Sequence, residues 1–360
     1  MSAQSLRVGV IGVGWAGEQH LKAYAKVPGV EIAALAGLEA DVRDAFAEEY
    51  GIAHGVARWE ELLELDGLDA VSICVPTFLH APIAVAALGR GLHVLAEKPL
   101  ARSAEEGGTM VQAARDAGRV LEVVFNHRRR GDIQALRDVV AEGRIGTPYY
   151  AKAWWMRRQG IPTLGSWFTQ ADLAGGGPLM DIGIHVLDYA LFLLGNAEVT
   201  AVSASTYDLL GTSGFGASTT AMKSGADGAK TFDVEDLATV FMRLADGGTL
   251  LLEASWAAHR SSDLDEFGAT LFGTHGGAHL SVVDYTPTGD LQVFGDEDGE
   301  LVATPVRVEP GRGHGAVVAD FVDTVRSGEW SGHDGTAAAR LARVIDACYQ
   351  SAAEQREIRL

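Results

Sequence analysis

Cysteine and basic residues are scarce in this chain of 360 residues, which has only two cysteines, Cys74 and Cys348. The two lie far apart and outside any Cys-x-x-Cys pair, so the sequence indicates neither a disulfide framework nor a zinc site. Lysine and arginine number 29 against 48 acidic residues, a net charge of −19. Surfaces that bind nucleic acid or anionic membranes need clustered basic side chains, so we expect neither partner.

Long apolar runs are also missing, and no stretch is long enough to span a bilayer. The first residues run into an expected strand without the apolar core of a signal peptide, so we expect a cytoplasmic protein. Hydrophobic residues make up 47% of the chain and charged residues 21%, the balance of a globular protein with a core. A length of 360 residues predicts two domains, because a domain averages about 150 residues.

A glycine motif follows the first expected strand, at residues 6–11. The next six residues are Gly12-Val13-Gly14-Trp15-Ala16-Gly17. In this pattern Gly12 permits a tight turn, Gly14 lets the backbone approach a pyrophosphate, and Gly17 lets the following helix lie close to the strand. The helix N-terminus adds free N–H groups for the phosphates. The motif therefore predicts a dinucleotide site that includes Trp15 and Ala16, the alternative being a plain glycine-rich turn.

The second expected strand, at residues 30–36, ends without the acid that usually binds the adenosine ribose. That acid normally lies about 20 residues beyond the last glycine. Here Gly37 occupies the position and Glu39 follows it. Glu39 in that role favours NAD, whereas the missing acid and the nearby Arg43 make NADP possible; Glu39 and Arg43 otherwise form a solvated pair. We predict NAD as the cofactor, with NADP possible.

Three further strands are expected at residues 70–75, 93–96 and 120–125, with helices at 81–91 and 103–118. Such repeated β-α units predict a doubly wound parallel sheet, a Rossmann domain, over residues 1–125. Ligands bind beyond the carboxyl ends of the strands in these sheets. The residues that follow two of these ends are candidate cofactor contacts: Pro76, Thr77, His80, Glu97 and Lys98.

Two of these residues allow more than one interpretation. His80 either faces the cofactor or is a capping or core histidine. Pro99 favours an extended conformation at Lys98, so the ammonium group is presented at the end of the strand. The alternative is a polar loop that only solvates the strand end.

Asp181 and His185 lie four residues apart in an otherwise apolar helical segment, and so on one helical face. Where they are buried they must be paired. The spacing fits a catalytic pair, a satisfied core pair or two metal ligands, but no third ligand stands at a telling distance. We therefore predict a catalytic pair and no metal.

The second half of the chain reads as an α+β domain over residues 126–360, with a mostly antiparallel sheet. Residues 208–231, rich in Gly, Ser, Ala and Thr, predict a mobile loop or lid. Trp155 and Trp167 flank a polar loop. Such tryptophans are usually core residues, yet an indole on a pocket wall also suits the C–H faces of a sugar ring.

The expected elements of the second half are seven strands and three helices. The strands lie at 149–156, 199–207, 236–244, 249–256, 269–272, 278–282 and 291–294, and the helices at 133–142, 315–327 and 335–353.

Together these motifs resemble the glucose-fructose oxidoreductase, inositol dehydrogenase and rhizopine catabolism (Gfo/Idh/MocA) family of NAD(P)-dependent oxidoreductases. The resemblance covers nearly the whole chain and departs from the family at Gly37 and Pro178. Its most distinctive part is Glu-Lys-Pro followed far downstream by the glycine-rich Asp-x-x-x-His motif. It rests on the glycine loop, Glu97-Lys98-Pro99, Asn126-His127-Arg128 and Gly175-Gly176-Gly177-Pro178-Leu179-Met180-Asp181-Ile182-Gly183-Ile184-His185-Val186-Leu187-Asp188.

The resemblance implies a dehydrogenase that moves a hydride between nicotinamide and a secondary alcohol of a sugar, sugar acid or cyclitol. It also implies an open-faced second sheet that forms a homodimer or homotetramer, and Asn126 close to the nicotinamide. His185 is the expected acid/base because an imidazole titrates nearest working pH, Lys98 acts on the same oxygen or carries the proton, and Asp181 orients them. The expected substrate contacts are Lys98, Arg128, Trp155, Trp167, Asp181 and His185.

Two other functions stay open at this point. One is a glycosidase of the same family that uses a tightly held NAD in a redox cycle. The other is a cofactor-binding regulator that has lost catalysis, which the joint presence of Lys98, Asp181 and His185 disfavours.

Overall fold

A computed structural model describes residues 5–216 and 231–360 of the chain, which forms two compact units. The first unit comprises residues 1–126 and 313–342, and the second comprises residues 127–312 and 343–360. Most of the loop predicted at 208–231 lies outside the described residues. Within the described ranges, no helix is both long and apolar enough to cross a bilayer.

The first unit contains a parallel six-stranded sheet in the order β3-β2-β1-β4-β5-β6, which confirms the doubly wound fold. The order reverses between β1 and β4, the switch point at which such sheets bind ligands. β4 and β5 are buried throughout because helices cover both faces. The strands are β1 (Leu6–Ile11), β2 (Val30–Ala36), β3 (His54–Val56), β4 (Ala70–Ile73), β5 (His93–Ala96) and β6 (Leu121–Val123).

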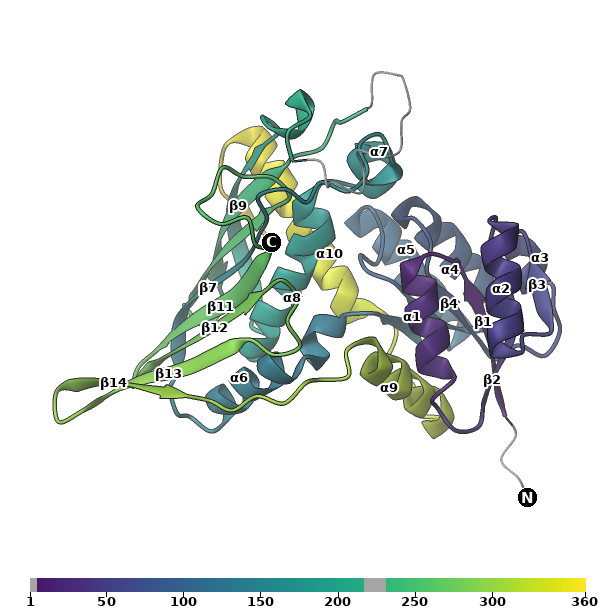
Figure 1. Cartoon of the computed structure of the whole chain (residues 1–360), viewed down its shortest axis with the longest axis horizontal. Helices are drawn as coiled ribbons and strands as arrows, with labels where there is room; N and C mark the ends of the chain where they lie inside the picture. The colour runs from purple at the N-terminus through teal and green to yellow at the C-terminus, as the bar shows by residue number, and fades with distance from the viewer. Residues whose placement is uncertain (1–4, 217–230) are drawn as a thin grey trace. The chain divides into compact units, whose positions relative to one another are not determined.

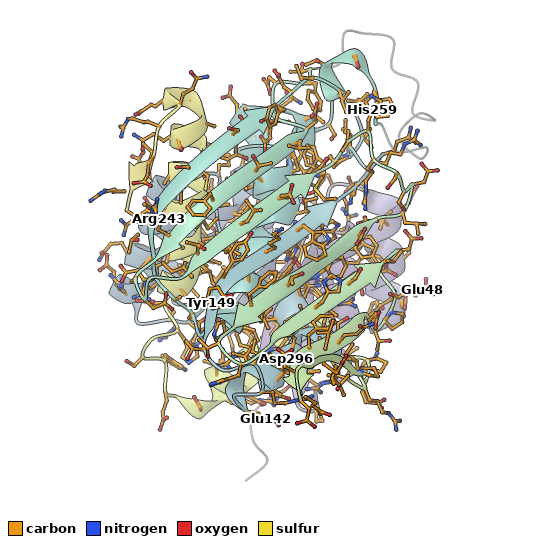
Figure 2. The ribbon with its side chains drawn as sticks, turned by 90° about the vertical axis from the view of Figure 1, so that its left-hand side faces the viewer. Glu48, Glu142, Tyr149, Arg243, His259 and Asp296 are labelled. Atoms are coloured by element: carbon orange, nitrogen blue, oxygen red, sulfur yellow. The ribbon has the colours of Figure 1, made fainter. Side chains whose placement is uncertain are left out.

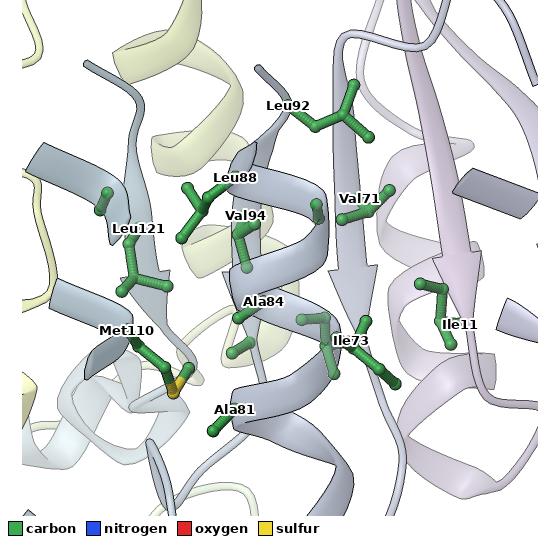
Figure 3. Close-up of a cluster of buried hydrophobic side chains, with 14 of the residues drawn as sticks. Ile11, Val71, Ile73, Ala81, Ala84, Leu88, Leu92, Val94, Met110 and Leu121 are labelled. Carbon is green, nitrogen blue, oxygen red and sulfur yellow. The ribbon is translucent and has the colours of Figure 1, made fainter. Parts of the chain in front are cut away.

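Short helices connect these strands. A side-chain cap begins α5, where the Ser103 hydroxyl accepts a hydrogen bond from the Glu106 N–H at 3.2 Å. Apolar side chains of α4 and α5 meet Val71, Ile73 and Val94 of the sheet in one buried cluster (Figure 3). The helices are α1 (Trp15–Tyr24), α2 (Ala40–Tyr50), α3 (Trp59–Leu63), η1 (Thr77–Leu79), α4 (His80–Gly89) and α5 (Ala104–Ala117).

Helix α9 (His314–Ser327) belongs to the first unit although it lies near the end of the chain. Its Phe321 and Val322 are buried in the same core as Val8 of β1. Arg326 Nη2 also donates to the Pro28 carbonyl at 2.8 Å. The predicted division at residue 125 did not include this return, because an amphipathic pattern shows which face is buried but not which partner buries it.

The second unit is built on a nine-stranded sheet in the order β14-β13-β12-β11-β7-β10-β9-β8-β15. Every neighbouring pair is antiparallel except β7 with β10, which confirms a mostly antiparallel sheet. Its strands are β7 (Pro148–Met156), β8 (Val199–Tyr207), β9 (Leu237–Leu244), β10 (Thr249–Ser255), β11 (Glu266–Gly273), β12 (Gly277–Val283), β13 (Asp290–Glu297), β14 (Glu300–Pro305) and β15 (Ile358–Arg359).

Helices α6 (Gly131–Ala141) and α8 (Ile184–Leu193) lie on one face of this sheet (Figure 1). Figure 2 looks onto the opposite face, where Arg243 is labelled and side chains stand on open strands. The remaining elements are η2 (Asn126–Arg129), η3 (Trp167–Thr169), α7 (Ala171–Ala174), the π-helical turn η4 (Leu179–Gly183), η5 (Gly211–Ser213) and α10 (Thr336–Glu354).

Candidate active site

The glycine loop between β1 and α1 has the shape that a pyrophosphate needs. Gly12 has φ +114°, and a Cβ there would lie 2.1 Å from the Cys74 carbonyl oxygen. A Cβ at Gly17 would lie 2.0 Å from the Gly12 oxygen, whereas one at Gly14 would meet nothing within 4 Å. The outer two glycines therefore permit close packing and the middle one leaves the backbone open. Trp15, the first residue of α1, is 67% exposed beside this opening, and Ala16 follows it half-buried.

Packing at the end of β2 explains why Gly37 replaces the acid that usually binds the adenosine ribose. A Cβ at Gly37 would lie 2.4 Å from Val13 Cγ1, so the glycine loop leaves no room for a side chain there. Glu39 is exposed just before α2. Arg43 donates to the Gly37 carbonyl at 3.2 Å and pairs with Asp44 at 2.9 Å, in place of the predicted pair with Glu39.

His80 proves to be a core histidine. Its Nδ1 lies 2.8 Å from the Pro99 carbonyl oxygen and its Nε2 lies 2.9 Å from that of Val75, so both ring nitrogens face backbone. Burial lowers the pKa of His80. The side chain thus holds the end of β4 against the Glu97-Lys98-Pro99 loop instead of facing a cofactor, because neither nitrogen is left for one. Beside it, Pro76 opens η1 and Thr77 is buried.

Glu97, at the end of β5, is the centre of a buried polar cluster. Its Oε1 lies 3.2 Å from His20 Nε2 and 3.4 Å from His314 Nε2, and its Oε2 accepts from the Lys98 N–H at 3.2 Å. Burial by itself would raise the pKa of Glu97, but hydrogen bonds from the two histidines hold it below its usual range. The Lys98–Pro99 peptide bond is cis. The carboxylate thus fixes the backbone from which Lys98 projects.

In the second unit, Gly176 and Gly177 of the Asp-x-x-x-His motif leave room for the buried side chain of Glu235. A Cβ at Gly177 would lie 2.1 Å from the Glu235 carbonyl oxygen, and one at Gly176 would lie 1.9 Å from the Tyr349 hydroxyl. The Glu235 carboxylate accepts from the N–H groups of Gly177 and Leu179 and from the Tyr349 hydroxyl, each at 2.9 Å. Glu235 therefore caps the turn that carries Asp181.

Asp181 lies in the π-helical turn η4 and His185 in the first turn of α8. A π-helix pairs residues five apart, so the side chains of this turn are displaced from the positions of a regular α-helix. The Asp181 Oδ2 accepts from Trp256 Nε1 at 2.9 Å. The His185 ring is buried with its centroid 4.6 Å from His127 and 5.9 Å from Trp155.

The other predicted substrate contacts of the second unit, Trp155, Trp167 and Arg128, each pack or pair with a different neighbour. Trp155 is only 2% exposed, while Trp167 stacks on Phe168 with ring centroids 3.7 Å apart. Arg128 makes a two-point ion pair with Asp188, at 2.7 Å and 2.6 Å. Burial raises the pKa of Asp188 to about 6 even though Arg128 opposes the shift. Asn126 begins η2, immediately before His127.

Several residues of the site were not singled out by the sequence. For His127, the only hint in the sequence is its place within the Asn126-His127-Arg128 segment. Arg157 and Trp256 follow the ends of β7 and β10, and these strands pair in parallel with Met156 opposite Ser255. That pairing joins the two ends, and it cannot be read from either strand alone.

A parallel sheet with a phosphate cradle at its switch point, joined to a helix-backed open sheet, defines a two-unit NAD(P)-dependent oxidoreductase. The chain belongs to the GFO/IDH/MocA family. Residues 6–125 match the family described as "Oxidoreductase family, NAD-binding Rossmann fold", and residues 133–279 match the "GFO/IDH/MocA C-terminal domain".

Individual relatives are similar over most of the chain. D-glucoside 3-dehydrogenase of Escherichia coli (strain K12) is 32% identical over 362 residues, which cover 98% of this chain and 97% of the relative. Levoglucosan dehydrogenase of Pseudarthrobacter phenanthrenivorans is 31% identical over 304 residues, covering 81% and 76%. A solved structure of levoglucosan dehydrogenase with NADH and levoglucosan has a TM-score of 0.84 at 26% identity, covering 99% of each chain. None of these relatives is described as a glycosidase or a regulator.

Proposed function

We propose that this oxidoreductase interconverts a secondary alcohol and a ketone on a sugar or cyclitol, with NAD as the hydride carrier. The observation that carries the proposal is His185, an imidazole buried among aromatic rings one turn from an acid that Trp256 holds in place. The names of the relatives, which are sugar dehydrogenases, support the substrate class.

We assign the proton transfer to His185, Lys98 and Asp181. The bound nicotinamide supplies the hydride acceptor. His185 takes the proton of the substrate hydroxyl, since an imidazole exchanges protons near neutral pH. Lys98 stabilises the negative charge that develops on the same oxygen, and Asp181 orients the groups around it. In the other version of this proposal, Lys98 is the proton carrier.

We propose that the pyrophosphate binds at the glycine loop, where its contacts are Gly12, Gly14, Trp15, Ala16 and Gly17. We propose that Glu39 accepts the ribose hydroxyl groups and so favours NAD, because Arg43 already bonds the Gly37 carbonyl and Asp44. The remaining proposed contacts lie at the strand ends and in η2: Pro76, Thr77, Glu97, Lys98 and Asn126.

A spectrophotometric screen tests this function. The purified protein is mixed with NAD or NADP and a panel of aldoses, glycosides and cyclitols, and reduced cofactor is followed at 340 nm. We expect substrate-dependent NADH formation with at least one ring polyol. Release of free sugar without net NADH formation would instead indicate the glycosidase, and cofactor binding without turnover of any probe would indicate the regulator.

We also propose that a second copy of the chain covers the open face of the second sheet, to form a homodimer or homotetramer. Aromatic side chains stand on that face: the Tyr150 and Phe272 rings stack at 5.2 Å, and those of Trp154 and His279 at 5.7 Å. Light scattering of the wild type and of Trp154→Glu tests this, and a monomeric wild type would refute it. We place the enzyme in the cytoplasm, where a nicotinamide pool can recycle its cofactor.

A further inference from the structure

One connected group of side chains in the second unit has no role in the proposed proton transfer. The Asp265 carboxylate accepts from Trp155 Nε1 and from Arg157 Nε, both at 2.6 Å. Arg157 Nη2 donates in turn to the Tyr285 hydroxyl. We call these four residues, Trp155, Arg157, Asp265 and Tyr285, the Asp265 cluster.

The Asp265 cluster adjoins the proposed catalytic residues of the same unit. The Trp155 ring lies 5.9 Å from that of His185 and 5.6 Å from that of Tyr285, centroid to centroid. Partial burial raises the pKa of Tyr285 against the lowering effect of Arg157, and the charges of Asp265 and Asp181 add to the rise. The phenol is therefore protonated at any working pH and is able to donate a hydrogen bond.

The backbone has unusual features next to two members of the Asp265 cluster, Tyr285 and Arg157. Asp284 and Tyr285 have φ of 48° and 54°, in a turn closed by the Thr286 N–H on the Val283 carbonyl at 3.0 Å. Turns with two left-handed residues normally carry Asn-Gly, and a bulky side chain there is unusual. A Cβ at Gly160 would lie 2.4 Å from Arg157 Cδ, so that glycine makes room for the arginine. Uncommon conformations of this kind persist mostly where function needs them.

The arginines of this region are already neutralised by acids. Arg157 pairs with Asp265 with side-chain exposures of 15% and 19%. Three further pairs follow the same pattern: Arg158 with Asp263, Arg260 with Glu266, and Arg128 with Asp188. A substrate carboxylate placed here would lie near the Asp265 and Asp181 charges, and each of the four arginines named above already has an acid partner, so its binding would be unfavourable.

Tyr285 suits a neutral ligand better. Its hydroxyl oxygen accepts from Arg157, which leaves its own O–H to donate elsewhere, and the residue is 50% exposed. A substrate hydroxyl oxygen is a matching acceptor. We propose that the Asp265 cluster is a subsite that binds, through the Tyr285 O–H, a substrate hydroxyl remote from the reacting carbon, and that it selects neutral sugars or cyclitols over sugar acids. This inference rests on the proposed dehydrogenase function and narrows it.

A matched pair of probes tests the selectivity. Methyl α-D-glucopyranoside and its uronate differ only in a CH₂OH or a carboxylate, and kcat and KM for each come from NADH formation. We expect the wild type to prefer the neutral probe by about tenfold or more in kcat/KM, the scale of one uncompensated charge. A wild type that prefers the uronate would overturn the inference.

Variants test which residues are responsible. Tyr285→Phe should raise KM for the neutral probe about threefold to tenfold with little change in kcat, because one remote hydrogen bond is lost. Asp265→Asn should weaken the preference for the neutral probe. Glu309→Gln removes the same charge at the exposed Arg307–Glu309 pair, which is not one of the pairs described above, and should leave the preference unchanged. If Asp265→Asn does not fold, Tyr285→Phe decides, and an unchanged KM in that variant counts against the subsite.

Calorimetry separates this inference from the proposed function. If neither probe is oxidised, the dehydrogenase assignment fails for this substrate class, and titration of each probe into the NADH-loaded protein then decides the subsite. Tighter binding of the neutral glycoside, lost in Tyr285→Phe, supports it. Tighter binding of the uronate, or no binding of either probe, refutes it.

Discussion

The Nε2 atom of His20 lies 3.2 Å from the Oε1 atom of Glu97. Both residues belong to the first unit, and Glu97 directly precedes Lys98 in the chain. The same His20 ring bonds the Ser72 hydroxyl through Nδ1 at 2.9 Å, and Ser72 bonds the Tyr24 hydroxyl at 2.9 Å. The central strands β4 and β5 and helix α1 are therefore joined by one chain of buried polar contacts that ends at the proposed catalytic lysine.

Glu97→Gln tests this chain of contacts through its pH dependence. The folded pKa of Glu97 lies below the ordinary value of 4.5, so the carboxylate contributes stability that is present above that value and lost as pH falls below it. We expect Glu97→Gln to lower the free energy of unfolding at pH 7 by on the order of 1–3 kcal/mol. Its melting temperature should fall less between pH 5 and pH 3 than that of the wild type. Parallel curves for the two proteins would contradict the assignment.

Two alanine substitutions in the glycine loop should behave differently. Gly12→Ala places a Cβ against the Cys74 carbonyl oxygen at φ +114°, so we expect a clear loss of melting temperature. Gly14→Ala meets nothing within 4 Å, so the fold should persist while NADH binding weakens at least tenfold, by about 1.4 kcal/mol or more. Thermal melting and NADH titration measure the two effects. Equal loss of stability in both variants would show that the middle glycine is not kept open for a ligand.

Lys98→Met should leave the phosphate cradle from Gly12 to Gly17 intact, and should reduce turnover far more than it weakens NADH binding. Loss of a general acid/base or of a charge stabiliser costs roughly 10²- to 10⁴-fold in rate. Steady-state rates at 340 nm and NADH titration measure the two properties. Arg102→Met, which removes a cation paired with Glu106 instead, is the matched control. Full activity of Lys98→Met with any substrate would rule out its proposed role.

His185→Asn separates a catalytic histidine from a packing one. If His185 is the base for alcohol oxidation, kcat/KM of the wild type rises with pH through one ionisation of the free enzyme, and the variant loses that limb. Activity per folded molecule is compared with the unfolding midpoint of the same samples. Near-native turnover with a lowered midpoint would mean that the ring only packs against His127 and Trp155.

The choice between NAD and NADP tests the proposed role of Glu39, which follows β2. Glu39→Ala should weaken NAD binding and leave NADP binding unchanged or stronger, because a carboxylate both accepts a ribose hydroxyl and repels a 2′-phosphate. Intrinsic tryptophan quenching with each nucleotide measures this. Tenfold tighter binding of NADP to the wild type would overturn the proposed preference for NAD.

Local pattern alone determined most of the first unit and the strands of the second. Glycine spacing after an apolar strand, uninterrupted apolar strands and the cap at Ser103 are local features, because their physical requirements lie within a few residues. The Glu-Lys-Pro segment and the glycine-rich Asp-x-x-x-His motif also marked the proposed catalytic residues, since each follows a recognisable strand or turn.

Only the tertiary structure decided which distant residues surround them. His314 reaches Glu97 from a helix more than 200 positions away, and Tyr349 reaches the capping acid Glu235 from α10. The core role of His80 and the Asp265 cluster likewise depend on contacts between elements that no local pattern pairs. The exclusion of a side chain at Gly37 by Val13 is of the same kind. Such contacts follow from how strands and helices pack in three dimensions, and residue spacing along the chain carries no information about them.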